Sequence, residues 1–223
     1  LQQALSQRHF DIIILGGHTG SGKTEVLHEL QRQGEQILDL EALAHHKGSA
    51  FGAMGEMPQP TVEQFENDLF EAFRKIPAGT RVWIEDESQS IGRVYIPPAF
   101  WQQMNTATMV RMDMPIEIRV KKLVVTYASF PKSDLVEAFE RIRKRLGGQH
   151  LKAAVEALDR DDFATAAEIA LRYYDKAYAM TQSKRAPELI VPVEIAFDDA
   201  AKAAEILLIK ANSFSKAVSF GGT

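Results

Sequence analysis

Residues 17–24 carry the pattern of a phosphate-binding loop, or P-loop. Their sequence, GHTGSGKT, fits the pattern G-x-x-x-x-G-K-S/T without a mismatch. Glycines in such a loop let backbone N–H groups converge on an anion, and the N-terminus of the following helix adds partial positive charge. Lys23 would reach a terminal phosphate, and the Thr24 hydroxyl could hold Mg²⁺. The residues expected to bind phosphate are Gly17, Gly20, Ser21, Gly22, Lys23 and Thr24.

The elements that position this loop can be predicted from its flanks. The apolar run Ile12 to Leu15, followed by glycines, is typical of a buried parallel strand. After the loop, Val26, Leu27 and Leu30 recur at helical spacing. Strand, glycine loop and helix form the context that confirms the motif. The motif alone leaves open an NTPase, a small-molecule kinase or a transferase.

Acidic residues at the end of another apolar strand are the candidate metal ligands. Val82-Trp83-Ile84 is followed by Glu85, Asp86 and Glu87. We expect Asp86 to hold the metal with Thr24, as in other P-loop proteins, with Glu85 and Glu87 competing for that role. The carboxyl edge of an open α/β sheet is where its ligands bind. The ordinary alternative is that some of these acids merely solvate the strand end.

The rest of the chain alternates predicted strands and helices. Strands are expected at residues 12–15, 36–40, 81–86, 106–112 and 189–195. Helices are expected to begin near Lys23, Thr61 and Pro115, with Asp198 capping the last, and residues 41–55 form a surface loop. Pro192 favours a sheet edge for the last strand.

This order predicts an α/β fold, a P-loop NTPase-like and mainly parallel sheet flanked by helices. Residues 133–178 are almost wholly helical in pattern, broken at Gly147-Gly148 and near residues 159–162. We therefore expect one P-loop domain over residues 1–223 with a helical insertion at about 133–182.

Composition narrows the class of protein. The chain has 223 residues and no cysteine, which excludes disulfides and thiolate chemistry carried by this chain alone. No stretch approaches the roughly 20 apolar residues that span a bilayer, and no signal peptide is evident, so a cytoplasmic protein is expected. Because the chain begins with Leu1, we also expect it to be a part of a longer protein or a processed product.

Positive charge gathers in one segment. The net charge of the chain is -4, yet residues 117–152 hold nine Lys or Arg against four acids. Arg141, Arg143, Lys144 and Arg145 could contact the phosphates of a nucleic acid, which gives affinity without sequence recognition. The same residues would suit the lid of a nucleotide kinase or a solvated helix face.

Several segments together resemble the tRNA 2-selenouridine synthases. They are LDLEALAHHKGSAFG at residues 38–52, WIEDES at 83–88, IGRVYIP at 91–97 and YYDKAY at 173–178, in addition to the P-loop. The resemblance covers most of the chain in the expected order. It matches the C-terminal P-loop part of that family and not its N-terminal rhodanese-like domain, which carries a functional cysteine.

The resemblance implies a function. The family converts the wobble 2-thiouridine of certain tRNAs to 2-selenouridine with selenophosphate, through an S-geranyl intermediate made from geranyl diphosphate. It implies a transferase with tRNA as substrate, possible use of Mg²⁺ and dependence on a rhodanese-like domain or chain. Lys23 and Asp86 would then act at the diphosphate.

Further site residues follow from the same resemblance. Arg93 could clamp the diphosphate bidentately, with a surface ion pair as the ordinary alternative. Lys47 and Ser49 lie in a glycine-bearing loop of the type that closes over ligands. Tyr174 could contact tRNA bases or a prenyl chain, although helical spacing to Tyr178 is equally what core packing produces.

Two other functions stay open at this stage. A small-molecule kinase using ATP would explain the P-loop and the basic segment but not residues 83–97. A non-catalytic module that binds tRNA and diphosphate would need the rhodanese-like partner for its chemistry. The leading hypothesis is the P-loop domain of a tRNA 2-selenouridine synthase.

Overall fold

A five-stranded parallel sheet forms the centre of the computed structural model, which describes residues 11–77 and 79–218. The strand order is β2-β3-β1-β6-β7, and each neighbouring pair is parallel. The prediction of an α/β fold with a mainly parallel sheet is confirmed. The predicted domain limits of 1 and 223 lie outside the described residues.

The elements follow one another along the chain as the alternating pattern predicts. The strands are β1 (Asp11–Gly17), β2 (Gln36–Leu38), β3 (Arg81–Glu85), β4 (Ser90–Ile91), β5 (Val94–Tyr95), β6 (Thr108–Asp113) and β7 (Ile190–Glu194). The α-helices are α2 (Lys23–Arg32), α3 (Leu40–Ala44), α4 (Val62–Lys75), α5 (Pro98–Thr106), α6 (Ile116–Tyr127), α7 (Lys132–Leu146), α8 (Gly148–Asp159), α9 (Phe163–Gln182) and α10 (Ala200–Val218). A 3₁₀ turn, Pro187–Leu189, precedes β7.

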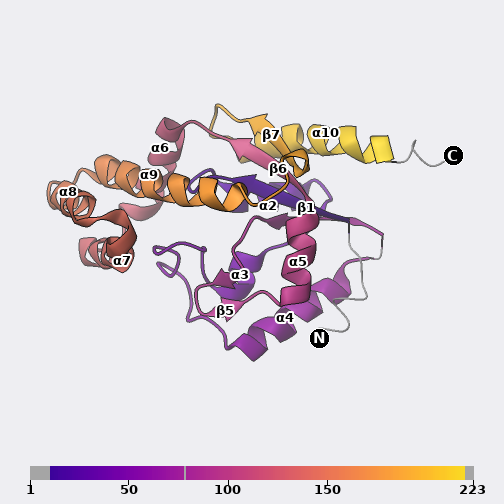
Figure 1. Cartoon of the computed structure of the whole chain (residues 1–223), viewed down its shortest axis with the longest axis horizontal. Helices are drawn as coiled ribbons and strands as arrows, with labels where there is room; N and C mark the ends of the chain where they lie inside the picture. Colours follow the sequence, from indigo (N-terminus) through magenta and orange to yellow (C-terminus); the bar gives the residue numbers. More distant parts are fainter. Residues whose placement is uncertain (1–10, 78, 219–223) are drawn as a thin grey trace.

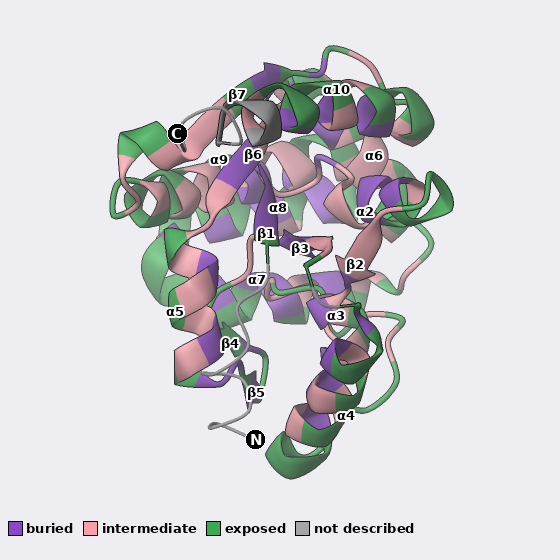
Figure 2. Ribbon diagram, turned by 90° about the vertical axis from the view of Figure 1, so that its right-hand side faces the viewer, coloured by how far each residue is buried: buried purple, intermediate pink, exposed green. Residues whose placement is uncertain are grey.

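Alternating side chains of the central strand bury both faces of the sheet. Ile12 and Ile14 of β1 pack into a cluster with α4 and α5, whereas Ile13 and Leu15 pack into one with α2 and α10. Figure 1 shows α4 and α5 on one side of the sheet and α10 on the other. Within the sheet, β1 and β3 are the most buried strands, whereas β2 and β7 are mostly half-buried (Figure 2). The carboxyl ends of β1 and β3 thus project from a rigid core.

Helices α7, α8 and α9 form a separate apolar cluster at one end of the molecule (Figure 1). Gly147, with φ of 89°, separates α7 from α8, and residues 160–162 separate α8 from α9. The predicted breaks are therefore confirmed. Phe51, from the segment after α3, packs into this cluster with its ring 5.2 Å from that of Phe139. The helical segment is thus joined to the loop beside the P-loop.

Three local predictions need correction. Residues 41–55 are not a plain loop, because Asp39 accepts a hydrogen bond from Ala42 N and caps the short helix α3. The connection around Pro97 contains the β4–β5 hairpin and the helix α5, which starts at Pro98. At the last helix it is Asp199, not the predicted Asp198, that accepts a hydrogen bond from Lys202 N.

Two other predictions hold. The Thr61 hydroxyl accepts a hydrogen bond from Gln64 N and caps α4. Strand β7, which contains Pro192, lies at the edge of the sheet. Its position fits the missing backbone donor of proline.

Candidate functional site

The P-loop joins β1 to α2 in a conformation that requires glycine. Gly20 and Gly22 have φ of 78° and 76°, in the left-handed region that side chains disfavour. A Cβ on Gly22 would also lie 2.9 Å from Lys122 Cε. Gly22 precedes α2 directly, so the loop presents the helix N-terminus to its ligand.

A cleft of about 250 Å³ lies over this loop. Of the predicted phosphate-binding residues, those that line it are Gly17, Gly20, Gly22, Lys23 and Thr24. Lys23 Nζ donates to Gly17 O at 3.1 Å. Ser21 is buried with 1% exposure, its N–H donates to His18 O, and its side chain does not line the cleft among the described residues. Phosphate binding by Ser21 stays a prediction.

Three glutamates that line the cleft lie close together. They are Glu41 of α3, Glu85 at the end of β3 and Glu87 just after it, and one carboxylate oxygen of each lies within 4.8 Å of the others. Thr24 Oγ1 donates to Glu41 Oε2 at 3.1 Å. Glu85 is 1% exposed, and its Oε1 has no hydrogen-bond partner within the described part of the chain.

Electrostatics make this cluster costly without a cation. Burial and, next to it, the nearby Glu41 carboxyl together raise the pKa of Glu85 to about 8. Desolvation also raises the pKa of Glu41 and that of Glu87, while the Lys23 ammonium opposes each rise. Carboxylate and hydroxyl oxygens are ligands of Mg²⁺ and Ca²⁺. The three glutamates and Thr24 therefore have the donor atoms for a hard divalent cation.

Asp86, the predicted metal ligand, lines the cleft but has other partners. Its carboxylate lies 3.8 Å from the guanidinium of Arg185, which is itself buried, and hydrogen-bonds the hydroxyl of Tyr178. Tyr178 in turn accepts a hydrogen bond from Gly17 N at 2.9 Å. In the structure Thr24 hydrogen-bonds Glu41, whereas Asp86 is linked to the P-loop through the hydroxyl of Tyr178. Glu41 was not among the predicted metal ligands, because it follows β2 and the predicted ligands follow β3.

Helix α9 holds the P-loop and the neighbouring loop through the YYDKAY segment. Arg119 of α6 is 4% exposed and forms a bidentate ion pair with Asp175, both bonds being 2.8 Å long. Arg119 also donates to Thr19 O of the P-loop at 3.2 Å. Tyr174 accepts a hydrogen bond from Ala50 N at 2.9 Å. The YYDKAY segment therefore holds the P-loop and residues 49–51 in place, a role that its sequence does not reveal.

The other predicted ligand-binding residues fall in different places. Lys47 and Ser49 line the cleft, and Lys47 Nζ also pairs with Glu56 at 3.0 Å. Arg93 is exposed in the turn between β4 and β5, where its N–H donates to Gln59 Oε1, and it is absent from the described residues that line the cleft. The predicted diphosphate clamp at Arg93 is therefore not supported, because the hairpin holds it outside the cleft.

Four basic residues in the C-terminal half of α7 are all exposed: Arg141, Arg143, Lys144 and Arg145. Arg141 pairs with Glu137 at 2.8 Å and donates to Ala50 O at 3.3 Å, which links it to the loop beside the cleft. Arg143 lies 3.8 Å from Glu140. Contact with tRNA stays a prediction for these residues.

Sequence comparison now decides the family. Residues 10–196 match the tRNA 2-selenouridine synthase AAA domain. The chain belongs to the tRNA 2-selenouridine synthase family. The family predicted from four short segments and the P-loop is thereby confirmed.

Curated relatives agree with that assignment. The tRNA 2-selenouridine synthase of Sulfurovum sp. (strain NBC37-1) is 38% identical over 168 residues, covering 67% of this chain and 45% of the relative. That of Cupriavidus pinatubonensis is 32% identical over 221 residues, covering 85% and 58%. The chain thus spans about half the length of the tRNA 2-selenouridine synthases it matches.

Shikimate kinase from Acinetobacter baumannii has a TM-score of 0.41 at 15% identity, covering 96% of this chain and 98% of that chain, a likeness too low to bear on function. None of the helices in the described ranges has the length and apolar composition to cross a membrane.

Proposed function

We propose that this domain binds geranyl diphosphate at its P-loop and transfers the geranyl group to the sulfur of wobble 2-thiouridine in tRNA. The observation that carries the proposal is the cleft itself, in a chain of this family. Lys23, Thr24 and three glutamates face the same space, which suits a ligand with two phosphates. The P-loop therefore need not serve ATP hydrolysis.

The reaction exchanges one bond for another. The 2-thiouridine sulfur attacks C1 of the geranyl group and forms a C–S bond, while the C1–O bond breaks and its electron pair leaves with diphosphate. The base loses its N3 proton to water, and the product is S-geranyl-2-thiouridine. Negative charge develops on the bridging oxygen as the C–O bond breaks. Lys23 and the N-terminus of α2 stabilise that charge at the cleft.

Mg²⁺ fits the same site. The unpartnered Oε1 of buried Glu85, with Glu41, Glu87 and Thr24 nearby, is the donor set that would hold it, and we propose these residues in place of Asp86. A bound divalent cation would neutralise charge on the leaving diphosphate. The raised pKa values of the three glutamates agree with a site that needs a positive charge beside it.

The later exchange of sulfur for selenium needs more than this chain. We propose that selenophosphate uses the same phosphate site after diphosphate leaves and that a rhodanese-like domain or chain supplies thiol chemistry. This chain has no cysteine and spans about half of its relatives. For tRNA, we propose contact with Lys47 at the cleft and with the exposed basic residues of α7.

The experiment is incubation of the chain with geranyl diphosphate, Mg²⁺ and tRNA that carries 2-thiouridine, followed by nucleoside mass spectrometry. The expected product is S-geranyl-2-thiouridine, and Lys23→Ala should remove it. Lys152→Ala, which deletes an exposed cation on α8, is the matched control and should keep full activity.

Three results would contradict the proposal in different ways. No S-geranyl product would exclude transfer by the chain alone. Product only after addition of a rhodanese-like protein would favour the binding-module alternative. Turnover of ATP with small acceptors, abolished by Lys23→Ala, would favour the kinase alternative.

A further inference from the structure

A second, apolar pocket lies beside the P-loop cleft, enclosed by α6, α7, α8 and α9. Its walls are aliphatic and aromatic side chains from all four helices, among them Leu123, Val124, Leu135, Phe139, Leu158 and Phe163. The pocket also has a floor of small residues on α9, since Ala166 and Ala170 line it and are almost fully buried. Such a lining favours hydrocarbon over any polar group.

The pocket and the phosphate cleft adjoin each other. Five residues line both: Thr19, Ser49, Leu123, Tyr127 and Tyr174. A single molecule could therefore place an anionic group over the P-loop and an apolar chain among the four helices. The structure thus combines the two environments that an amphiphilic diphosphate requires.

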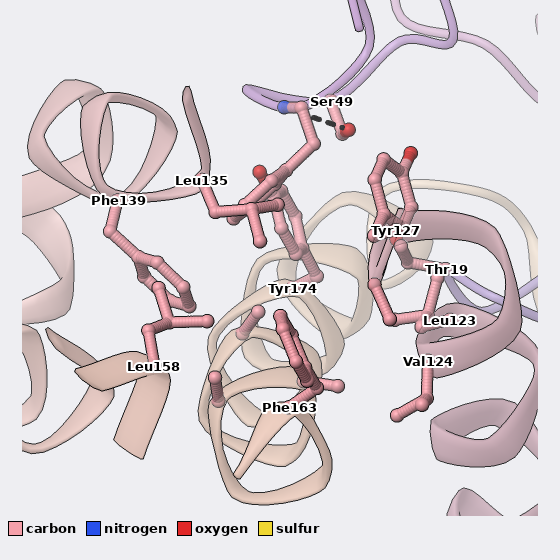
Figure 3. Close-up of a pocket in the computed structure, with 15 residues that line it drawn as sticks. Thr19, Ser49, Leu123, Val124, Tyr127, Leu135, Phe139, Leu158, Phe163 and Tyr174 are labelled. Carbon is pink, nitrogen blue, oxygen red and sulfur yellow. Dashed lines mark hydrogen bonds between the residues drawn. The ribbon is translucent and has the colours of Figure 1, made fainter. Parts of the chain in front are cut away.

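Polarity within the pocket changes from one end to the other. Figure 3 shows the hydroxyl ends of Tyr127 and Tyr174 on the side where Ser49 lies, while Phe163 lies on the opposite side. Leu158 and Phe139 close a flank away from Ser49 (Figure 3). Burial raises the pKa of Tyr127 and that of Tyr174 to about 12, so both hydroxyls stay neutral. The polar end faces the cleft and the far end is apolar.

We infer that this pocket binds the hydrocarbon chain of the allylic diphosphate and that Phe163, at its far end, limits the length of that chain. The inference rests on the proposed function, because it places the chain of the same ligand. On this inference, the length of the hydrocarbon chain that binds is set by Phe163, which lies at the end of the pocket opposite Ser49.

Two variants test the pocket from opposite directions. Ala166→Leu places a larger side chain inside it and should exclude the hydrocarbon chain. Phe163→Ala enlarges its far end and should admit a longer one. Affinities of each variant and of the wild type are measured by calorimetry for inorganic pyrophosphate, geranyl diphosphate and farnesyl diphosphate, with Mg²⁺ present. Pyrophosphate affinity reports whether each variant keeps an intact P-loop.

The wild type should bind geranyl diphosphate at least about tenfold more tightly than pyrophosphate, since burial of a few methylene groups suffices for that factor. Ala166→Leu should remove this advantage and leave pyrophosphate affinity unchanged. Phe163→Ala should shift the ratio of farnesyl to geranyl affinity by about tenfold or more toward farnesyl.

Other results would overturn the inference. Equal affinity of the wild type for pyrophosphate and geranyl diphosphate would show that the protein does not bind the geranyl group. An unchanged advantage in Ala166→Leu would show that it binds elsewhere, and an unchanged ratio in Phe163→Ala would exclude Phe163 as the limit.

The outcomes separate this inference from the proposed function. Tighter binding of geranyl diphosphate than of pyrophosphate, without S-geranyl product, would support the pocket and exclude transfer by this protein. S-geranyl product with an unaltered Ala166→Leu variant would support transfer and exclude the pocket.

Discussion

Replacement of Tyr178 by phenylalanine should weaken both the fold and the P-loop. The Tyr178 hydroxyl accepts a hydrogen bond from Gly17 N at 2.9 Å and hydrogen-bonds Asp86. Phenylalanine would keep the ring contact with His18, whose centroid lies 5.0 Å away. The variant therefore removes one oxygen and leaves the packing in place.

The size of the effect follows from what loses its partner. Gly17 is buried, so its N–H would lack a hydrogen bond in Tyr178→Phe, at a cost of about 1–3 kcal/mol. Asp86 would keep its contact with Arg185, which limits the loss there. We expect about 2 kcal/mol of lost stability, or a fall in Tm of about 4–8 °C for a chain of this size.

Urea unfolding and thermal melts measure the stability, and pyrophosphate titration measures the P-loop. Tyr173→Phe is the matched control, because the Tyr173 hydroxyl makes no hydrogen bond to the described residues while its ring contacts Tyr174. Tyr178→Phe should lower stability and pyrophosphate affinity together, and Tyr173→Phe should change neither. Equal Tm values for Tyr178→Phe and the wild type would refute the assignment of α9 as the support of the P-loop.

The remaining predictions concern the metal, the buried ion pair and tRNA. Glu85→Gln should leave the metal-free protein about as stable as the wild type, because the raised pKa of Glu85 keeps that carboxyl mostly uncharged at neutral pH and glutamine has nearly the same shape. It should abolish the rise in Tm that millimolar Mg²⁺ gives the wild type, and a retained rise would contradict the metal site. Asp175→Asn should lower the free energy of unfolding in urea by about 3 kcal/mol, since it leaves buried Arg119 without its anion. Glu168→Gln, which breaks an exposed ion pair, should lower it by less than about 1 kcal/mol. Equal losses in the two variants would contradict a stabilising role for the Arg119–Asp175 pair. Lys144→Glu should lower tRNA affinity several-fold at low salt and flatten its salt dependence without changing geranyl diphosphate affinity; unaltered tRNA binding would exclude α7 from the contact surface.

The sequence predicted the sheet, the P-loop and the breaks in the helical segment because these depend on local patterns. Apolar runs and glycines near residues 12–24 specify a strand, a turn and a helix without long-range information. Gly147 allows a positive φ and Pro192 lacks a backbone N–H wherever they stand, so their effects were also predictable.

Partners brought together by the fold could not be predicted in the same way. Glu41 meets Glu85 and Thr24 only because β2 lies beside β3 and directs α3 to the P-loop. Asp86 was predicted as the metal ligand by analogy with other P-loop strands. Its partners are Tyr178, in α9, and Arg185, just after α9, which lie far from Asp86 in the sequence.

The apolar pocket is the clearest example of a feature that the amino-acid sequence did not predict. Leu123, Leu135, Leu158 and Phe163 each follow helical spacing that ordinary core packing would also produce. Only the arrangement of α6 to α9 leaves space between them and sets that space beside the cleft. Tyr174 was predicted as a ligand contact and lies where the two spaces join.

A crystal structure of the chain with geranyl diphosphate and Mg²⁺ would test the central claim most directly, because that claim is that one ligand occupies both spaces. We expect the diphosphate over residues 17–24, the cation among Glu41, Glu85 and Glu87, and the carbon chain ending at Phe163. A carbon chain that points away from α6 to α9, with the diphosphate still on the P-loop, would contradict the account.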